Sequence, residues 1–291
     1  MKAKPELLSP VFDLVSLRAA ISAGADAVYF GLKGLNMRIT AKNFELGQLK
    51  NIVKICHENN VKAYLTLNTI IYDEDMKKLE AMIKEAKKAK VDAVICWDPA
   101  VIMQARKITK GKIPLHISTQ ASVSNSEAAR FYKKLGAKRI ILARELNLKQ
   151  IKDIKNKVNI EIECFVHGAM CVSMSGRCFM SQFVFGRSAN RGDCLQPCRR
   201  SYIIKDKEEG FELELGNNYV LSPMDLCTLP FIEKLIEAGI DAFKIEGRAR
   251  SPEYVKVVTE CYRKAIDAYF DKKLTPELKQ ELMNKLRTVY N

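Results

Sequence analysis

Features that the sequence lacks exclude several classes of protein. Its apolar runs all fall short of the roughly 18 residues that a membrane-spanning helix requires. The opening residues 1–6, with two lysines and a proline, do not resemble a signal peptide. We therefore expect a cytoplasmic protein with no membrane partner, in a compartment where thiols stay reduced. At 47% hydrophobic and 28% charged residues, the composition is that of a folded chain.

The chain also lacks the short motifs of several enzyme classes. It contains no H-E-x-x-H of zinc peptidases and no G-x-S-x-G of serine hydrolases. No G-x-G-x-x-G follows the first predicted strand, which disfavours a dinucleotide-binding fold. The remaining case for a peptidase is a thiol nucleophile, because Cys171 lies four residues after His167.

Acidic residues are too few to balance the basic ones. The chain has 34 aspartates and glutamates against 48 lysines and arginines, a formal net charge of +14 at pH 7. This excess favours a polyanionic partner such as a nucleic acid. Solvated lysine-rich helices explain the same excess, since lysines recur at helical spacing at positions 84, 87, 88 and 90. Charge alone leaves both explanations open.

Cysteines are concentrated in one segment. Four of the nine lie between Cys171 and Cys198, separated by 6, 15 and 3 residues, and Cys227 follows 29 residues later. Thiols gathered in this way indicate metal or redox chemistry. Residues 171–200 also hold five arginines, at 177, 187, 191, 199 and 200, and a single acid, Asp193. The other cysteines, expected to be small core residues, are Cys56, Cys96, Cys164 and Cys261.

The spacing of the thiols leaves the metal open. Zinc sites use C-x2-4-C knuckles, which only the pair Cys194 and Cys198 approaches. Iron–sulfur clusters accept scattered cysteines, because four thiolates need only converge on one cubane. Phenylalanines and methionines around the segment would exclude water from such a cluster. An iron–sulfur site is favoured, with zinc and unligated thiols as alternatives.

Apolar segments without period-two alternation recur along the chain and predict eight parallel strands. The predicted strands are 6–9, 24–31, 62–67, 90–98, 115–119, 136–144, 160–166 and 239–247. Amphipathic helices are predicted between them, for example over 46–58, 75–88, 126–135 and 253–270, with N-caps at Asp73, Asn125, Asn147 and Ser251. Eight strand–helix units predict that residues 1–291 form a single α/β domain, a (β/α)8 TIM-like barrel. A doubly wound open sheet is the alternative.

In such a barrel, functional side chains gather at the C-terminal ends of the strands. These ends carry a polar ring of Ser9, Asn68, Asp98, Ser118, Thr119, Gln120, Arg144, Glu145, His167, Glu246 and Arg248. The cysteine-rich insertion, residues 168–227, follows the seventh strand and should lie over the same mouth, with a hairpin from Tyr202–Lys205 and Tyr219–Leu221. For His167 a structural role is preferred, then proton transfer, then ligation, and His116 is a candidate to point into the barrel.

Several motifs resemble those of the family catalogued as peptidase U32, the collagenase-like proteases. The longest runs from Glu163 to Ser181, as E-x-F-x2-G-A-M-C-x4-G-x-C-x-M-S. Further similarity lies in residues 6–10, 186–200, 222–227 and 244–248, so the resemblance covers nearly the whole chain.

Better-understood relatives in that family are oxygen-independent hydroxylases with a [4Fe–4S] cluster. The resemblance implies an RNA hydroxylase, foremost one that converts tRNA wobble uridine to 5-hydroxyuridine with prephenate as hydroxyl donor. A hydroxylase of another substrate, such as an rRNA cytidine, and a U32 peptidase are the alternatives. The implied cluster ligands are Cys171, Cys178, Cys194 and Cys227, with the Cys194–Cys198 pair as an alternative.

Roles for other residues follow within this hydroxylase interpretation. His167, Glu246 and Arg248 are the predicted catalytic residues. Arg38, Arg144 and Arg248 are expected to hold a dicarboxylate donor, because a guanidinium binds carboxylates in bidentate fashion. The residues expected to face RNA phosphates are Arg177, Arg187, Arg191, Arg199 and Arg200. Longer relatives add a small C-terminal β domain that this chain is expected to lack, so a second U32-family subunit is a candidate partner.

Overall fold

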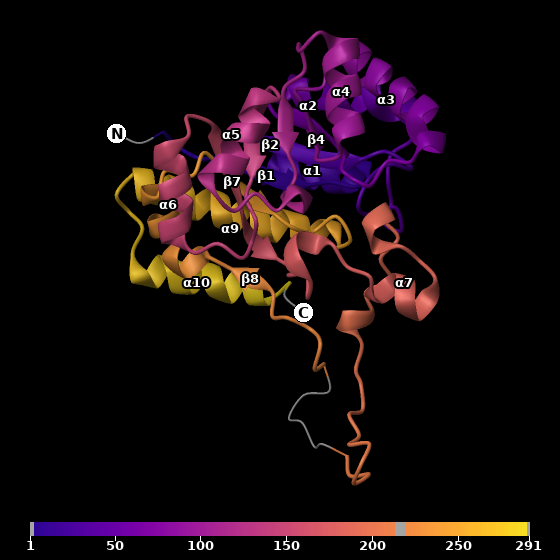
Figure 1. Cartoon of the computed structure of the whole chain (residues 1–291). Helices are drawn as coiled ribbons and strands as arrows, with labels where there is room; N and C mark the ends of the chain where they lie inside the picture. Colours follow the sequence, from indigo (N-terminus) through magenta and orange to yellow (C-terminus); the bar gives the residue numbers. More distant parts are fainter. Residues whose placement is uncertain (1–2, 213–218, 290–291) are drawn as a thin grey trace.

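The computed structural model describes residues 3–212 and 219–289, which fold around a closed parallel β-barrel (Figure 1). Within these residues the barrel strands are β1 (Glu6–Pro10), β2 (Ala27–Gly31), β3 (Lys62–Leu67), β4 (Ala93–Cys96), β5 (Leu115–Ile117), β6 (Ala137–Ile141), β7 (Glu161–Gly168) and β9 (Ala242–Ile245). Each strand pairs in parallel with the next, and β9 pairs with both β7 and β1, which closes the barrel. The predicted (β/α)8 fold is confirmed, and the open-sheet alternative is excluded.

Helices surround the barrel, as the amphipathic patterns predict (Figure 1). They are α1 (Leu14–Ser22), α2 (Leu49–Glu58), α3 (Met76–Ala89), α4 (Pro99–Thr109), α5 (Ser126–Lys134), α6 (Leu148–Lys157), α8 (Ile232–Glu237), α9 (Pro252–Phe270) and α10 (Pro276–Arg287), while α7 (Met180–Phe185) lies in the cysteine-rich insertion. Short 3-10 turns are η1 (Leu46–Gln48), η2 (Asp73–Asp75), η3 (Thr119–Ala121), η4 (Met174–Gly176), η5 (Ala189–Arg191), η6 (Pro197–Arg199) and η7 (Leu229–Phe231). Over the described part of the chain, none of the helices has both the length and the apolar character needed to cross a membrane.

Three of the four predicted N-caps are confirmed. The side chains of Asn125, Asn147 and Ser251 each accept a hydrogen bond from a backbone amide in the first turn of α5, α6 and α9. The prediction for Asp73 is wrong. Residues 73–75 form a 3-10 turn ahead of α3, and Asp75 instead accepts a hydrogen bond from the amide of Tyr72 at 2.9 Å.

Both faces of the strands are buried. On β2, Tyr29 belongs to the cluster inside the barrel and Phe30 to the layer between barrel and helices. His116 faces inward as predicted, with its ring centre 4.8 Å from that of Tyr64. Because neither face meets water, the strands read as continuous apolar runs. The expected core cysteines are buried, namely Cys56, Cys96, Cys164 and Cys261.

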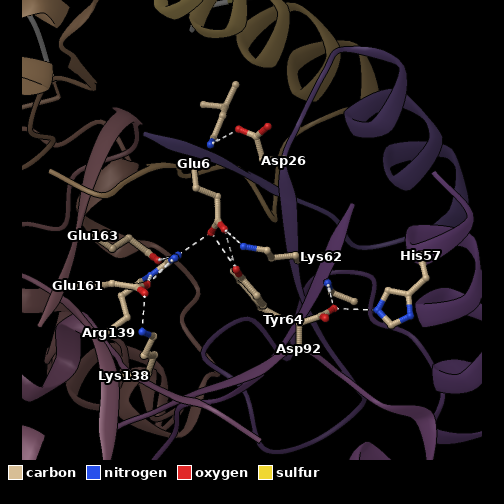
Figure 2. Close-up of polar contacts among 12 residues, drawn as sticks. Glu6, Asp26, His57, Lys62, Tyr64, Asp92, Lys138, Arg139, Glu161 and Glu163 are labelled. Atoms are coloured by element: carbon tan, nitrogen blue, oxygen red, sulfur yellow. Dashed lines mark hydrogen bonds and ion pairs between the residues drawn. The ribbon is translucent and has the colours of Figure 1, made fainter. Parts of the chain in front are cut away.

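Charged side chains near the N-terminal ends of the strands form a connected network (Figure 2). Arg139 Nη1 on β6 donates to Glu6 Oε1 on β1 at 2.6 Å and to Glu163 Oε2 on β7 at 3.3 Å. Glu163 Oε1 in turn accepts a hydrogen bond from Lys244 Nζ on β9 at 2.9 Å. Arg139, Glu163 and Lys244 are all buried, so these charges compensate one another in place of water.

The cysteine-rich insertion leaves the barrel after β7. Its last residues form a short strand, β8 (Leu226–Cys227), which pairs antiparallel with the end of β7. The predicted arms Tyr202–Lys205 and Tyr219–Leu221 contain no strand, and Lys205 forms an isolated bridge with Glu212. Residues 213–218 of the predicted hairpin lie outside the described residues, so the hairpin stays a prediction.

Candidate functional site

The C-terminal ends of the strands surround a polar pocket, the mouth pocket. Members of the predicted ring that line it are Asn68, Ser118, Thr119, Gln120, Arg144, Glu246 and Arg248, joined by Tyr29, Met37, Arg38, Thr66, Ile95, Ile141, Phe165 and Lys244. Other ring members have structural contacts instead. The Ser9 hydroxyl bonds that of Thr259 on α9 at 2.8 Å, and Asp98 caps α4. Glu145 accepts a hydrogen bond from the amide of Ser175 at 2.7 Å.

Arg248 is the most deeply buried arginine of the mouth pocket, with 4% of its surface exposed. Its guanidinium donates to Thr66 Oγ1 at 3.1 Å and to Asn36 Oδ1 at 3.0 Å. Burial lowers the pKa of Arg248 to about 10. Gly31 makes room for this arrangement, because a Cβ there would lie 2.5 Å from both Arg248 Nη1 and Asn36 Cγ.

The mouth pocket carries more positive charge than its own carboxylate balances. Arg38 Nη2 pairs with Glu246 Oε1 at 3.0 Å. Arg144 donates to a backbone carbonyl and Arg248 to neutral side chains, and within the described residues neither has an ion-pair partner. A buried guanidinium without a counterion is costly, so this pocket is suited to an anionic ligand.

Lys244 is a member of the pocket lining that the sequence patterns did not single out. Its ammonium donates to Glu163 and lies 4.3 Å from the centre of the Tyr29 ring. Burial lowers the pKa of Lys244. The sequence does contain an indication of this pair, because Lys244 and Glu163 each interrupt an apolar strand. Charges buried inside a barrel need partners of opposite sign.

A second pocket, the thiol pocket, adjoins the mouth pocket. Cys171, Cys178, Cys194 and Cys198 all line it, and it shares Met37, Arg38, Gln120 and Arg144 with the mouth pocket. All four thiols are free and partly buried. Burial raises the pKa of Cys198, and the charge of Cys171 raises it further.

The thiol pocket offers the type of donor that an iron–sulfur cluster uses. Over the residues that the structure describes, no three histidine, cysteine or acidic side chains are grouped so that they could hold a metal ion. A cubane cluster needs soft thiolate ligands spread around a larger core. Four cysteines around one pocket provide that chemistry.

Cys227, the predicted fourth ligand, is not among the residues that line the thiol pocket. It lies opposite His167 in the β7–β8 pairing, and its sulfur is 3.8 Å from that of Met283 on α10. This side chain packs against the outer core layer. The structure therefore brings together three of the four predicted ligands, with Cys198, the sequence alternative, beside them.

His167 is held away from both pockets, although a catalytic role is predicted for it. The β7–β9 register shifts between Phe165, which lines the mouth pocket, and His167. The histidine ring instead packs against α9, where Nδ1 lies 3.4 Å from the Tyr262 hydroxyl. Burial lowers the pKa of His167 to about 4. These contacts favour the structural role.

The five arginines predicted to face RNA divide into two groups. Three of them form ion pairs within the chain, Arg187 with Asp193, Arg191 with Asp75 and Arg199 with Asp225. Arg177 and Arg200 are exposed, and over the described residues neither has an acidic partner. Of these three, Arg191 fixes the cysteine-rich insertion to the barrel, whereas Arg187 and Arg199 pair within the insertion. Arg177 and Arg200 remain available to a ligand.

The fold and pockets together define a TIM-barrel protein with an arginine-lined mouth beside a group of four thiols. The sequence model of Peptidase family U32 matches residues 13–291, and the chain belongs to this family. A solved U32 peptidase shares the fold, with a TM-score of 0.55 and 14% identity over 84% of this chain and 93% of that one.

Curated relatives carry two kinds of name. A collagenase of Porphyromonas gingivalis is 45% identical over 98% of this chain and 71% of its own length. The tRNA hydroxylation protein P1 of Bacillus subtilis is 40% identical over 91% of this chain and 64% of its own length. A 23S rRNA 5-hydroxycytidine synthase of Escherichia coli is 40% identical over 92% of this chain and 40% of its own length.

Proposed function

We propose that this chain is an oxygen-independent RNA hydroxylase that binds a [4Fe–4S] cluster in the thiol pocket and an anionic hydroxyl donor in the mouth pocket. The observation that carries the proposal is the adjacency of the two pockets. The buried, unpaired guanidinium of Arg248 lies in the mouth pocket, four thiols line the adjoining pocket, and Arg38 and Arg144 line both. A donor held by these arginines would meet the cluster directly.

The proposed cluster ligands are Cys171, Cys178, Cys194 and Cys198. When bound, the cluster would supply iron that activates the oxygen donor. The chain itself lowers the cost of the thiolate charge, because the guanidiniums of Arg38 and Arg144 border the same pocket.

The proposed donor is a dicarboxylate, and prephenate is the candidate that the family resemblance implies. Arg248 and Arg144 are placed to bind its carboxylates, since neither is neutralised by the protein. Glu246 orients Arg38 through their ion pair. Lys244 offers a proton donor on the same wall, held in position by Glu163.

The proposed substrate is the wobble uridine of tRNA, with an rRNA cytidine as the second candidate. The names of the Bacillus subtilis and Escherichia coli relatives support RNA as the class. The net charge of +14 is consistent with a polyanionic substrate.

A thiol peptidase is the alternative that the Porphyromonas gingivalis name suggests. It would need a base close to its nucleophile. The sulfur of Cys171 lies 3.1 Å from the Ser173 hydroxyl, while the His167 ring packs against Tyr254 and Tyr262. This arrangement favours the hydroxylase.

Anaerobic purification with iron and sulfide analysis tests the cluster. Wild type and Cys227→Ser should contain iron and sulfide and absorb visible light, whereas Cys178→Ser and Cys198→Ser should lose both. A colourless wild-type protein that contains zinc would contradict the proposal. Loss of iron in Cys227→Ser, with retention in Cys198→Ser, would restore the sequence-derived ligand set.

Mass spectrometry of nucleosides tests the activity. Cells that lack the gene should lose 5-hydroxyuridine from tRNA or 5-hydroxycytidine from rRNA, and wild-type protein should restore it. Arg248→Lys should keep the iron but require more donor, because a bidentate carboxylate contact worth roughly 2–3 kcal/mol is lost. Unchanged nucleosides together with iron-independent peptide cleavage would establish the peptidase instead.

A further inference from the structure

Helix α7 in the cysteine-rich insertion exposes a group of apolar side chains. Phe179 and Phe183 are 75% and 91% exposed, and Met174 and Val184 are 61% and 51% exposed. Phe179 and Phe183 are four residues apart and lie on the same side of the turn, where the Phe183 amide donates to the Phe179 carbonyl at 2.8 Å. We call these four residues the α7 patch. Large apolar side chains that are exposed together in one short segment are typical of binding surfaces.

The segment that carries the α7 patch is fastened by polar contacts. The amide of Cys178 donates to Asn190 Oδ1, and the amide of Leu195 donates to the Ser181 hydroxyl, both at 3.1 Å. Arg191 ties the same segment to the barrel loop that carries Asp75. Figure 1 shows α7 apart from the helices that cover the barrel. These contacts fix the backbone of the segment, so Phe179 and Phe183 stay exposed to solvent and do not pack into the barrel core.

Two exposed arginines lie close to the α7 patch. Arg177, two residues before Phe179, donates to the Ser122 hydroxyl at 3.0 Å, and the Arg200 guanidinium lies 4.6 Å over the centre of the ring of Phe185, the last residue of α7. The sole acid in the sequence from 168 to 200 is Asp193, which pairs with Arg187. Exposed aromatic rings next to unneutralised guanidiniums are the combination that binds unpaired nucleotides, through base stacking and phosphate contacts.

The position of α7 relative to the proposed active site fits this ligand. Cys178, Met180 and Ser181 line the thiol pocket, so one side of the segment borders the pocket while Phe179 and Phe183 face solvent. A nucleotide whose base approaches the opening of the two pockets would have its neighbours within reach of the outer side.

We propose that the α7 patch is a stacking platform for unpaired nucleobases next to the modified nucleotide, with Arg177 and Arg200 binding the adjoining phosphates. The inference rests on the proposed RNA hydroxylase function and adds the surface that selects single-stranded RNA. A second copy of the chain is a poorer occupant. Two such faces would each bring exposed arginines, and each chain already carries a net charge of +14.

Fluorescence anisotropy with two RNA probes tests the proposal on the full chain. One probe is a short hairpin with an unpaired loop, and the other is a blunt duplex of the same length. Phe179→Ala and Phe183→Ala should each weaken hairpin binding by about tenfold, because stacking of one base is lost. Duplex affinity and iron content should not change. Phe131→Ala is the matched control, since Phe131 is also exposed, at 57%, but lies on α5.

The arginines should behave differently from the phenylalanines. Arg177→Gln and Arg200→Gln should each reduce the salt dependence of hairpin binding by about 0.7 in the log–log slope. Hairpin affinity that is unchanged in the Phe179→Ala/Phe183→Ala double variant would overturn the proposal. So would sedimentation showing a wild-type dimer that the double variant abolishes. Wild-type protein that modifies no RNA and binds neither probe would instead remove the proposed function itself.

Discussion

The buried ion pair between Glu163 and Lys244 provides a sharp test of how the barrel interior is stabilised. Glu163 is fully buried and accepts hydrogen bonds from Lys244 at 2.9 Å and Arg139 at 3.3 Å. Replacing it with glutamine keeps the shape but leaves two buried cations with less compensation. Breaking a buried pair by removing one partner costs roughly 3–5 kcal/mol. We expect Glu163→Gln to lower the free energy of unfolding by about 3 kcal/mol, since the amide oxygen can still accept one hydrogen bond.

Glu161→Gln is the matched control on the same strand (Figure 2). Glu161 also pairs with Arg139, at 2.9 Å, but its side chain is 30% exposed. Water can replace the lost contact, so this variant should lose no more than about 1 kcal/mol. Adding Lys244→Met to Glu163→Gln should recover stability, because the stranded cation is removed.

Urea unfolding followed by circular dichroism and by the fluorescence of Trp97, the single tryptophan, measures these differences. The two signals must coincide for the free energies to be valid. The loss of unfolding free energy in Glu163→Gln should become smaller as the pH rises toward 10. In this variant the unpaired Lys244 is deprotonated in the folded protein, while the unfolded chain still binds that proton. Equal losses for Glu161→Gln and Glu163→Gln would refute the reasoning that burial sets the cost.

Other predictions concern single positions. Gly31→Ala should raise the donor concentration needed for activity at least tenfold by displacing Arg248, whereas Gly47→Ala should have no such effect, since a Cβ at Gly47 meets nothing within 4 Å. His116 stays neutral in the fold, because burial and then Arg139 lower its pKa. The unfolded chain gains that proton below about pH 6.5. The free energy of unfolding should therefore decrease as the pH is lowered below this value, by up to about 1.4 kcal/mol per pH unit. His116→Phe should flatten this slope in urea titrations. Asn147→Ala should lower the free energy of unfolding by about 1 kcal/mol through loss of the α6 cap, and an equal melting temperature would contradict it.

Local features of the fold could be predicted because their causes lie within a few residues. Asn125, Asn147 and Ser251 cap helices by bonding an amide three residues on, so each sequence window contains both partners. Asp73 shows where this reasoning stops. Asp75, two residues later, takes the Tyr72 amide and also binds Arg191, which comes from far along the chain.

The candidate site could be predicted only in outline. The arginines that line the mouth pocket follow from strand ends, because every parallel strand delivers its C-terminus to the same rim. His167 also lies near the C-terminal end of a strand, β7, but the register shift after Phe165 turns it toward α9. A one-residue shift exchanges the two faces of a strand, and no spacing rule reveals it.

The sequence by itself determined the eight-stranded barrel, the location of the chemistry at its C-terminal mouth and the membership of Cys171, Cys178 and Cys194 in one group. The apolar runs and the density of thiols can both be recognised within contiguous residues, and burial of both strand faces follows from the apolar runs. Only the tertiary structure decided that Cys198 and not Cys227 lines the thiol pocket, and that Lys244 faces Glu163, 81 residues away. Such choices depend on which way a side chain points after the chain has closed on itself, and packing across the barrel sets that direction.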